Sequence, residues 1–205
     1  MEIKLIFEDT NFIVIDKPAG ISTHYSPGDN AANVVDLMKR THPYLHPVSR
    51  LDNGTSGLLL LALKPDVVSK IELVQKSYIA QVFGIAPISG IIEKELVTKE
   101  FGTGRKKRQT ALSRYRKIKS DEDTSCLLVH IETGRHHQIR KHLRSIGHPI
   151  VGDFRHGYKD KNLAYQEKLG ERLRMMLHCS QLMIKHQKRI LTFKAPILLQ
   201  FFPAL

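Results

Sequence analysis

The residues best suited to chemistry lie in the segment Ser49–Leu60, where a carboxylate and a guanidinium precede an apolar run. Arg50 stands two residues before Asp52, and an Asn-Gly pair follows, as tight turns favour. The Leu58–Leu63 run, interrupted by one alanine, has the length of a buried strand, about 5 to 6 residues. A polar loop anchored to a rigid strand can hold a catalytic carboxylate in place.

A second polar segment, Thr133–Asp153, contains four histidines within thirteen residues, a density that raises the possibility of a metal site. The segment has neither a His-Glu-x-x-His pattern nor a cysteine, and its cationic side chains repel a divalent ion. No metal site is therefore expected. The basic side chains that could instead contact phosphate, or simply lie at the surface, are Arg135, Lys141 and Arg144.

The charge of the chain favours a polyanionic partner. Its 32 Lys and Arg residues exceed its 20 Asp and Glu residues, for a formal net charge of +12. Basic side chains are concentrated between Gly102 and Lys119, where no acidic residue occurs, as phosphate binding requires. An exposed loop is expected over residues 102–108, and its basic members are Arg105, Lys106, Lys107 and Arg108. The alternative is a basic surface that only confers solubility.

The chain lacks the features of secreted and membrane proteins. Its longest apolar run is far shorter than the roughly 20 residues that span a bilayer, and its first residues do not form a signal peptide. The only cysteines are Cys126 and Cys179, so a disulfide framework is not expected. A reducing cytoplasm is the expected location.

The distribution of apolar runs predicts an α+β fold, a single domain over residues 1–205 with a mixed, mainly antiparallel sheet and flanking helices and loops. Strands are expected at 5–7 and 12–15 as a hairpin, 58–63, 76–84, 90–99 as a pair, 111–118, 127–132, 175–184 and 189–193. Helices are expected at 32–40 and 135–145, and a helix start followed by an amphipathic stretch at 65–75. Residues 155–172 are expected to be irregular.

These motifs resemble those of the RluA-type pseudouridine synthases. That family commonly has His-Arg-Leu-Asp, two variable residues and Thr-Ser-Gly, and this chain has Ser49 in place of the histidine. Residues 133–153 resemble the family's Thr-Gly-Arg-x-His-Gln-Ile-Arg, Gly-His-Pro-Ile and Gly-Asp motifs. Leu177–Leu182 is similar to its Leu-His-Ala-x-x-Leu segment. Residues 152–157 and the Met-Leu-His-Cys-Ser-Gln run further resemble the tRNA pseudouridine synthase C branch.

The resemblance implies a role for each matching residue. Asp52 corresponds to the nucleophile and Arg140 to the arginine that pairs with it. Tyr78 would contact the uracil and assist proton transfer, and Leu177 would close the pocket around the ring. Arg50 would fill the gap that the target uridine leaves when it flips out of the RNA. The resemblance also implies a central catalytic cleft, and the S4-type RNA-binding domain of some members is not expected in this chain.

The preferred interpretation is a cofactor-independent RNA pseudouridine synthase that acts on tRNA or large-subunit ribosomal RNA as a monomer. The reaction is a net isomerisation, so no cofactor is needed. A non-catalytic RNA-binding protein on the same scaffold would keep the basic loop and lose the carboxylate. A metal-dependent nuclease would need clustered acidic ligands, and the acidic residues of this chain are scattered.

Overall fold

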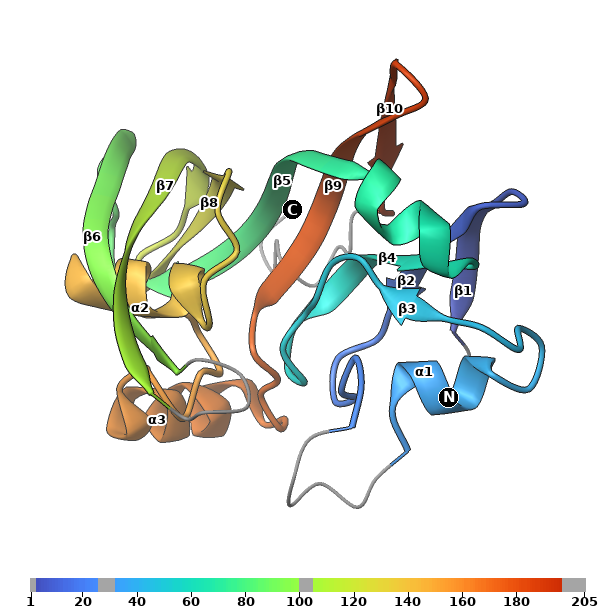
Figure 1. The fold of residues 1–205 in the computed structure, drawn as a ribbon. Coiled ribbons are helices and arrows are strands. Elements are labelled where there is room, and N and C mark those ends of the chain that lie inside the picture. The colour runs from blue at the N-terminus through green and yellow to red at the C-terminus, as the bar shows by residue number, and fades with distance from the viewer. Residues whose placement is uncertain (1–2, 26–31, 100–104, 197–205) are drawn as a thin grey trace. The chain divides into compact units, whose positions relative to one another are not determined.

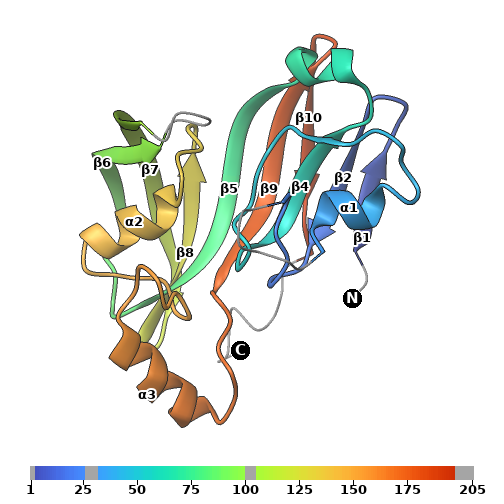
Figure 2. The same ribbon diagram turned by 60° about the horizontal axis from the view of Figure 1, so that its bottom comes forward.

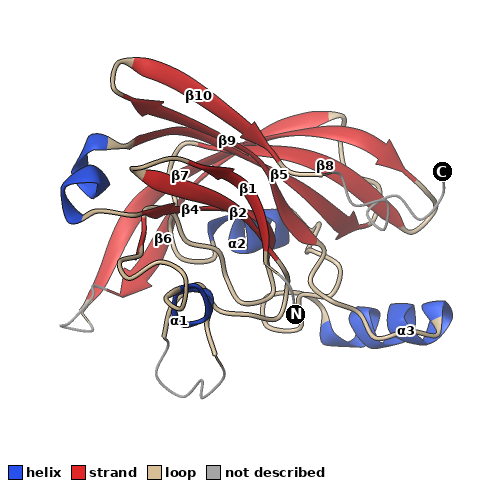
Figure 3. Cartoon of the chain, turned by 90° about the vertical axis from the view of Figure 1, so that its right-hand side faces the viewer, coloured by secondary structure: helices blue, strands red, loops and turns tan. Residues whose placement is uncertain are grey.

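The computed structural model describes residues 3–25, 32–99 and 105–196, and its chain divides into two compact units (Figure 1). The first unit consists of Met1–Ser77 with Leu177–Leu198, and the second of Tyr78–Met176 with Leu199–Leu205. Figure 3 shows that strands predominate in the described residues and that helices are few. The expected α+β class is therefore confirmed.

The first unit is built from two parts of the chain, one before and one after the main segment of the second unit in the sequence. Its elements are β1 (Lys4–Glu8), β2 (Phe12–Lys17), α1 (Val34–Met38), β3 (His46–Pro47), β4 (Ser56–Ala62), the 3-10 helix η1 (Pro65–Lys70), the start of β5 (Glu72–Phe83), β9 (Leu177–His186) and β10 (Arg189–Lys194). The strand order is β1-β2-β4-β9-β5, with β3 on β4 and β10 on β9. The β4–β9 pairing is parallel, whereas β1–β2, β2–β4 and β9–β10 are antiparallel.

The second unit continues β5 and adds a long antiparallel hairpin. Its elements are β6 (Ser89–Lys99), β7 (Lys106–Ser120), β8 (Thr124–Ile131), α2 (Gln138–Ser145) and α3 (Lys159–Leu169). The strand order is β5-β8-β7-β6, and α2 packs on β6 and β7 (Figure 2). Alternate residues of β7 are buried, including Ala111, Ser113 and Tyr115, and their neighbours Arg114 and Arg116 are exposed. Period-two burial of this kind is expected where one face of a strand is covered.

The leucine run forms β4 as predicted, and all seven of its residues are buried. It pairs with β2, whose residues Phe12–Ile15 are completely buried as well. An uninterrupted apolar sequence fits a strand with both faces covered. The predicted hairpin at the start of the chain, the helix near residue 35 and the two closing strands are also confirmed.

Three local predictions about strands and loops are wrong, and a fourth concerns residues that the structure does not describe. Residues 90–99 form one strand rather than a pair, because β6 pairs with β7 along its whole length. That pairing also extends β7 back to Lys106, so Lys106, Lys107 and Arg108 lie in a strand rather than in a loop. Residues 72–75 begin β5 instead of ending an amphipathic stretch. The loop prediction for residues 102–104 lies outside the described residues.

Two predictions about where helices form are also wrong. The segment expected to be irregular contains α3, whose only buried residue is Asn162. The Asn162 side chain accepts from Gly152 N (2.6 Å) and donates to Asp153 O (3.2 Å), and Tyr165 packs edge-on against Phe83. A polar anchor and one aromatic contact, rather than an apolar stripe, therefore hold this helix. Helix α2 begins at Gln138, three residues later than predicted, because His137 has a left-handed backbone conformation.

Candidate active site

The Asp52 loop of the first unit is held on both sides by hydrogen bonds. Thr23 Oγ1 donates to Leu51 O (2.8 Å) and accepts from Leu51 N (3.1 Å), and both residues are buried. After the carboxylate, Thr55 N donates to Asp52 O (3.0 Å), which closes a turn into β4. Asp52 is half-buried and Arg50 is exposed. The loop therefore has a fixed backbone, with the guanidinium at its outer side.

Ser49, which occupies the position of the family's usual histidine, has a structural role. It is buried, and its Oγ accepts a hydrogen bond from Leu60 N (3.1 Å). Ser49 N also donates to Leu60 O (3.3 Å). These contacts attach the residue before Arg50 to the middle of β4. The substitution therefore leaves the Asp52 loop anchored to its strand.

Lys17, at the end of β2, is a site residue that sequence reasoning missed. Its side chain is fully buried, and Nζ donates to Pro18 O (2.8 Å), Ile21 O (2.7 Å) and Asn53 O (3.3 Å). Burial lowers the pKa of Lys17 from 10.5 to about 7, while the negative charge of Asp52 acts in the opposite direction. A lysine two residues after the apolar run Phe12–Ile15 is the sequence signal that could have identified it.

The lowered pKa of Lys17 predicts that stability rises with pH. The folded protein releases this proton near pH 7 and the unfolded chain near pH 10.5, so between these values the unfolded state binds more protons. Urea unfolding at several pH values between about 7 and 10 should give wild type a steeper rise than Lys17→Met. The excess should approach about 1.4 kcal/mol per pH unit. Parallel curves for the two proteins would show that Lys17 does not titrate in this window.

Leu177 lies next to the strand that follows the Asp52 loop. It is the first residue of β9 and is buried, and its neighbour His178 pairs with Ser56 in the parallel β4–β9 ladder. His178 Nδ1 also lies 2.9 Å from Ser56 Oγ. Gly57, with φ of 107°, faces the backbone of Cys179 so closely that a Cβ would collide with it. This close approach fixes Leu177 near the start of β4.

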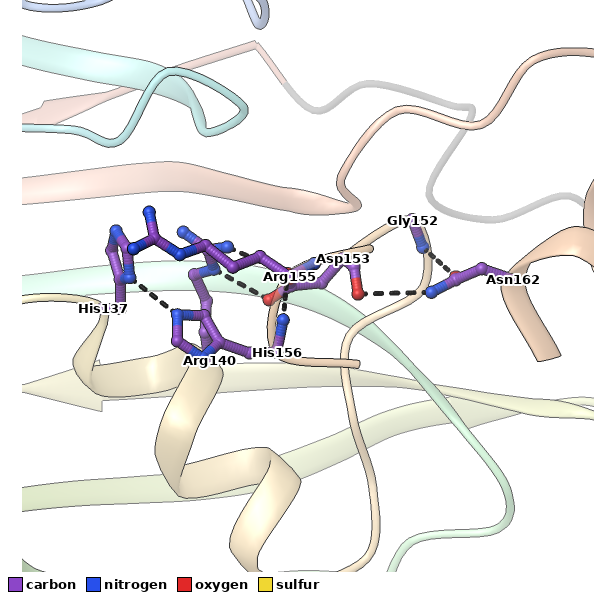
Figure 4. A network of polar contacts seen from close by, with 7 residues as sticks. All are labelled: His137, Arg140, Gly152, Asp153, Arg155, His156 and Asn162. Atoms are coloured by element: carbon purple, nitrogen blue, oxygen red, sulfur yellow. Dashed lines mark hydrogen bonds and ion pairs between the residues drawn. The ribbon is translucent and has the colours of Figure 1, made fainter. Parts of the chain in front are cut away.

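In the second unit, Arg140 forms a buried bidentate ion pair with Asp153 (Figure 4). Arg140 Nε donates to Asp153 Oδ2 (2.7 Å) and a terminal nitrogen donates to Oδ1 (2.9 Å). Burial raises the pKa of the Asp153 carboxyl, but hydrogen bonds from Arg140 and from His156 N, together with the positive charges nearby, lower it by more, so the net pKa lies below its usual value. Both groups are therefore charged at neutral pH, and Asp153 orients the guanidinium.

The other predicted residues of the second unit differ in their exposure to solvent. Tyr78 is buried in β5. The cluster Arg105–Arg108 is exposed at the start of β7, where Arg108 lies 3.9 Å from Glu95. Lys141 Nζ approaches Val97 O on β6 at 3.5 Å. Arg144 lies over the Tyr158 ring, with 3.9 Å between Cζ and the ring centroid, and donates to its hydroxyl (2.7 Å). Arg135 is half-buried before α2.

The structure thus brings Arg50, Asp52 and Leu177 together with Lys17 in the first unit. Tyr78, Arg140 and the basic residues belong to the second. Among the described residues, no group of three or more His, Cys, Asp or Glu side chains is arranged to hold a metal ion. In the same residues, no helix is long and apolar enough to cross a membrane.

Comparison with known proteins identifies the family. Residues 11–145 match the family model described as RNA pseudouridylate synthase. The tRNA pseudouridine synthase C of Yersinia pestis is 31% identical over 90% of this chain and 81% of the relative. The ribosomal large subunit pseudouridine synthase D of Nitrosomonas europaea is 30% identical over 95% of this chain and 62% of the relative.

Solved structures agree on the fold. Human RNA Pseudouridylate Synthase Domain Containing 4 has a TM-score of 0.74 at 23% identity, and the match covers 97% of this chain and 90% of the human one. The Domain Containing 1 protein has a TM-score of 0.73 at 21% identity, with 98% and 86% coverage. The fold and the family match define an RNA-modifying isomerase. The chain belongs to the RluA-type RNA pseudouridine synthase family.

Proposed function

We propose that this enzyme converts specific uridines of tRNA or large-subunit ribosomal RNA to pseudouridine, with Asp52 as the nucleophile. The observation that carries the proposal is the Asp52 loop, whose backbone is fixed by Thr23 and by the turn into β4. A half-buried carboxylate on a rigid loop has the low reorganisation cost that nucleophilic catalysis needs. Lys17 lies close enough to this carboxylate for the negative charge of Asp52 to act on the pKa of the lysine.

The reaction breaks the bond from ribose C1′ to uracil N1 and forms one from C1′ to C5. The hydrogen on C5 is lost, N1 gains a proton, and no oxidant, reductant or other reactant is consumed. Asp52 acts at the sugar or at the uracil ring, and Tyr78 assists the proton transfer through its hydroxyl. We propose, as the family resemblance implies, that Arg140 is the partner of the Asp52 carboxylate. A guanidinium has five N–H donors, and Asp153 uses two of them, so this second role is compatible with the observed pair.

Arg50 has the exposure and shape required for base flipping. Extruding a stacked uridine costs a few kcal/mol, and a planar guanidinium that enters the vacated space recovers part of that cost. The side chain of Arg50 is exposed at the outer side of the Asp52 loop. Leu177, buried at the start of β9, contacts the uracil ring from the pocket side in this proposal.

The proposed substrate follows from the names of the relatives, which are synthases of tRNA and of large-subunit ribosomal RNA. The proposed enzyme works as a monomer in the cytoplasm and uses no cofactor. Mapping pseudouridine in total RNA from cells that lack this gene would identify the target. Loss of a pseudouridine in tRNA alone would assign the enzyme to tRNA, and loss in ribosomal RNA alone would exclude that assignment.

Tritium release from RNA labelled at uracil C5 tests the activity itself. The proposed enzyme should release the label in proportion to the pseudouridine formed, and the RNA should stay intact on a denaturing gel. A protein that only binds RNA releases nothing, and a nuclease shortens the RNA. Stable binding of the cognate RNA without release of the label would therefore contradict the proposal.

The cluster Arg105–Arg108 should bind RNA phosphates, because its four basic side chains are exposed. Neutralising all four should weaken binding, and the slope of log affinity against log salt should flatten by about 0.7 to 0.9 for each phosphate that the variant no longer binds. The matched control neutralises four exposed basic residues of the β9–β10 hairpin, Lys185, Lys188, Arg189 and Lys194. If both quadruple variants change the slope equally, only the net charge matters and the cluster has no specific role.

A further inference from the structure

Two histidines are hydrogen-bonded to each other beside the Arg140–Asp153 ion pair. His137 Nδ1 lies 2.7 Å from His156 Nε2, so one imidazole donates and the other accepts. Figure 4 shows this contact next to the ion pair, with His137 at the start of α2 and His156 in the turn after Asp153. Each histidine therefore belongs to the segment that carries one partner of the ion pair.

His137 has a backbone conformation that side-chain-bearing residues seldom adopt. Its φ is 55° and its ψ is 32°, in the left-handed region. Among the described residues, the other non-glycine residues with positive φ are Gln187 and Lys188, which form the tight β9–β10 turn where such angles are usual. His137 lies in no hairpin, and such a conformation persists where the surrounding structure holds the residue in place. The side chain of His137 forms the hydrogen bond with His156, and its ring stacks on that of His136 with 3.6 Å between centroids.

The second histidine is attached directly to the carboxylate of the ion pair. His156 N donates to Asp153 Oδ1 (2.9 Å), and Arg155 N donates to the same oxygen (3.1 Å). Gly157 N closes the turn on Asp153 O (2.8 Å). A continuous series of contacts therefore runs from the start of α2 through His137, His156 and Asp153 back to Arg140 on the first turn of the helix. The hydrogen bond between the two imidazoles therefore joins the segment that carries Arg140 to the segment that carries Asp153.

The pair can hold only a limited number of protons. An N–H···N hydrogen bond needs one lone pair, so it survives one added proton and breaks when both rings are cationic. Burial, Arg140, Lys141 and Arg155 lower the pKa of His156, and Asp153 opposes them. The His137 ring contacts the His156 ring edge-on, and the His136 ring stacks on that of His137. A lowered pKa favours the neutral form of His156, which leaves a lone pair for the hydrogen bond, and acid strong enough to protonate both rings breaks that bond.

We propose that His137 and His156 are positioning residues that hold Arg140 in its reactive orientation through their mutual hydrogen bond and release it in acid. This inference rests on the proposed role of Arg140 in catalysis. A hydrogen bond that positions a catalytic group acts on the rate of the chemical step rather than on RNA affinity. Displacing a catalytic group by about 1 Å can reduce a rate by as much as a hundredfold.

Substitutions at both positions test the proposal in single-turnover assays of tritium release. His137→Gly tolerates the left-handed backbone but lacks the imidazole, and we expect its rate at pH 7.5 to fall by about tenfold to a hundredfold. RNA affinity should stay within about twofold, since phosphate contacts dominate it. His156→Gln can keep a hydrogen bond to His137 without titrating. This variant should retain most of the rate at pH 7.5. Its rate should fall less than the wild-type rate as the pH is lowered, because the contribution of the His137–His156 pair to the pH profile is absent.

His130→Gln is the matched control, because His130 is half-buried in β8 and its pKa is also lowered by burial. It should reproduce the wild-type rate and pH profile. NMR should detect scalar coupling between His137 Nδ1 and His156 Nε2 at neutral pH in the wild-type protein, and that signal should vanish in acid. A wild-type rate and pH profile in His137→Gly would overturn the inference. Absence of tritium release from the wild-type enzyme would instead overturn the proposed function.

Discussion

The Asp52→Asn variant is expected to lose all measurable turnover while it keeps its fold and its affinity for RNA. The amide has nearly the same shape as the carboxylate, so the Thr23 and Thr55 hydrogen bonds to the loop backbone remain. The nucleophile, however, is absent. Tritium release should fall to background, whereas RNA binding, dominated by phosphate contacts, should change little.

Asp66→Asn is the control for this substitution. Asp66 is an exposed carboxylate of the same unit that accepts a hydrogen bond from Lys70 (2.7 Å). Its replacement should leave turnover at the wild-type rate. An Asp52→Asn rate within about tenfold of wild type, equivalent to about 1.4 kcal/mol of activation free energy, is too large for an enzyme without its nucleophile. Such a result would exclude Asp52 from that role.

Replacing Arg140 by alanine should have two separable consequences. Asp153 would be left buried without its cationic partner, which costs about 3 to 5 kcal/mol of unfolding free energy. Turnover should also collapse, because the guanidinium that we propose as the partner of Asp52 is gone. Urea unfolding measures the first effect, and single-turnover tritium release at a temperature where the variant is folded measures the second.

Arg140→Lys distinguishes pairing geometry from charge alone. An ammonium keeps the positive charge but lacks the planar fork that contacts both oxygens of Asp153. We expect this variant to regain part of the stability and only a small part of the activity. If Arg140→Lys works as well as wild type, the bidentate geometry is not required. If Arg140→Ala does so, the proposed pairing with Asp52 is wrong.

Acid should weaken the fold in part through Asp153. Its pKa lies below the ordinary value in the folded state, so its contribution to stability is complete above the unfolded pKa near 3.8 and disappears as pH falls through the folded pKa. Wild type should therefore lose more unfolding free energy than Asp153→Asn between about pH 5 and pH 2, although the variant starts from a lower stability. Circular dichroism in urea at several pH values measures the difference.

Local sequence was sufficient for the strands whose residues alternate or run unbroken. β2 and β4 were recognisable because each contains an unbroken apolar run that has the length of a strand and is too short for a typical helix. Helix α3 was not recognisable, because its residues form no apolar stripe and it is anchored by one buried asparagine and one aromatic contact with Phe83. β7 extends back to Lys106 because it pairs with β6 there. The basic residues themselves have no sequence pattern that predicts this pairing.

The sequence by itself determined the chemical groups and the family, because the Arg50–Asp52 loop and the Arg140 motif are contiguous patterns of side chains. Only the tertiary structure decided what those groups contact. Lys17 is brought to Asn53 across 36 residues, and Arg140 is oriented by a carboxylate 13 residues away. Burial and pairing of charges depend on segments that meet only after folding. Their pKa values and orientations are therefore properties of the folded chain rather than of any local pattern.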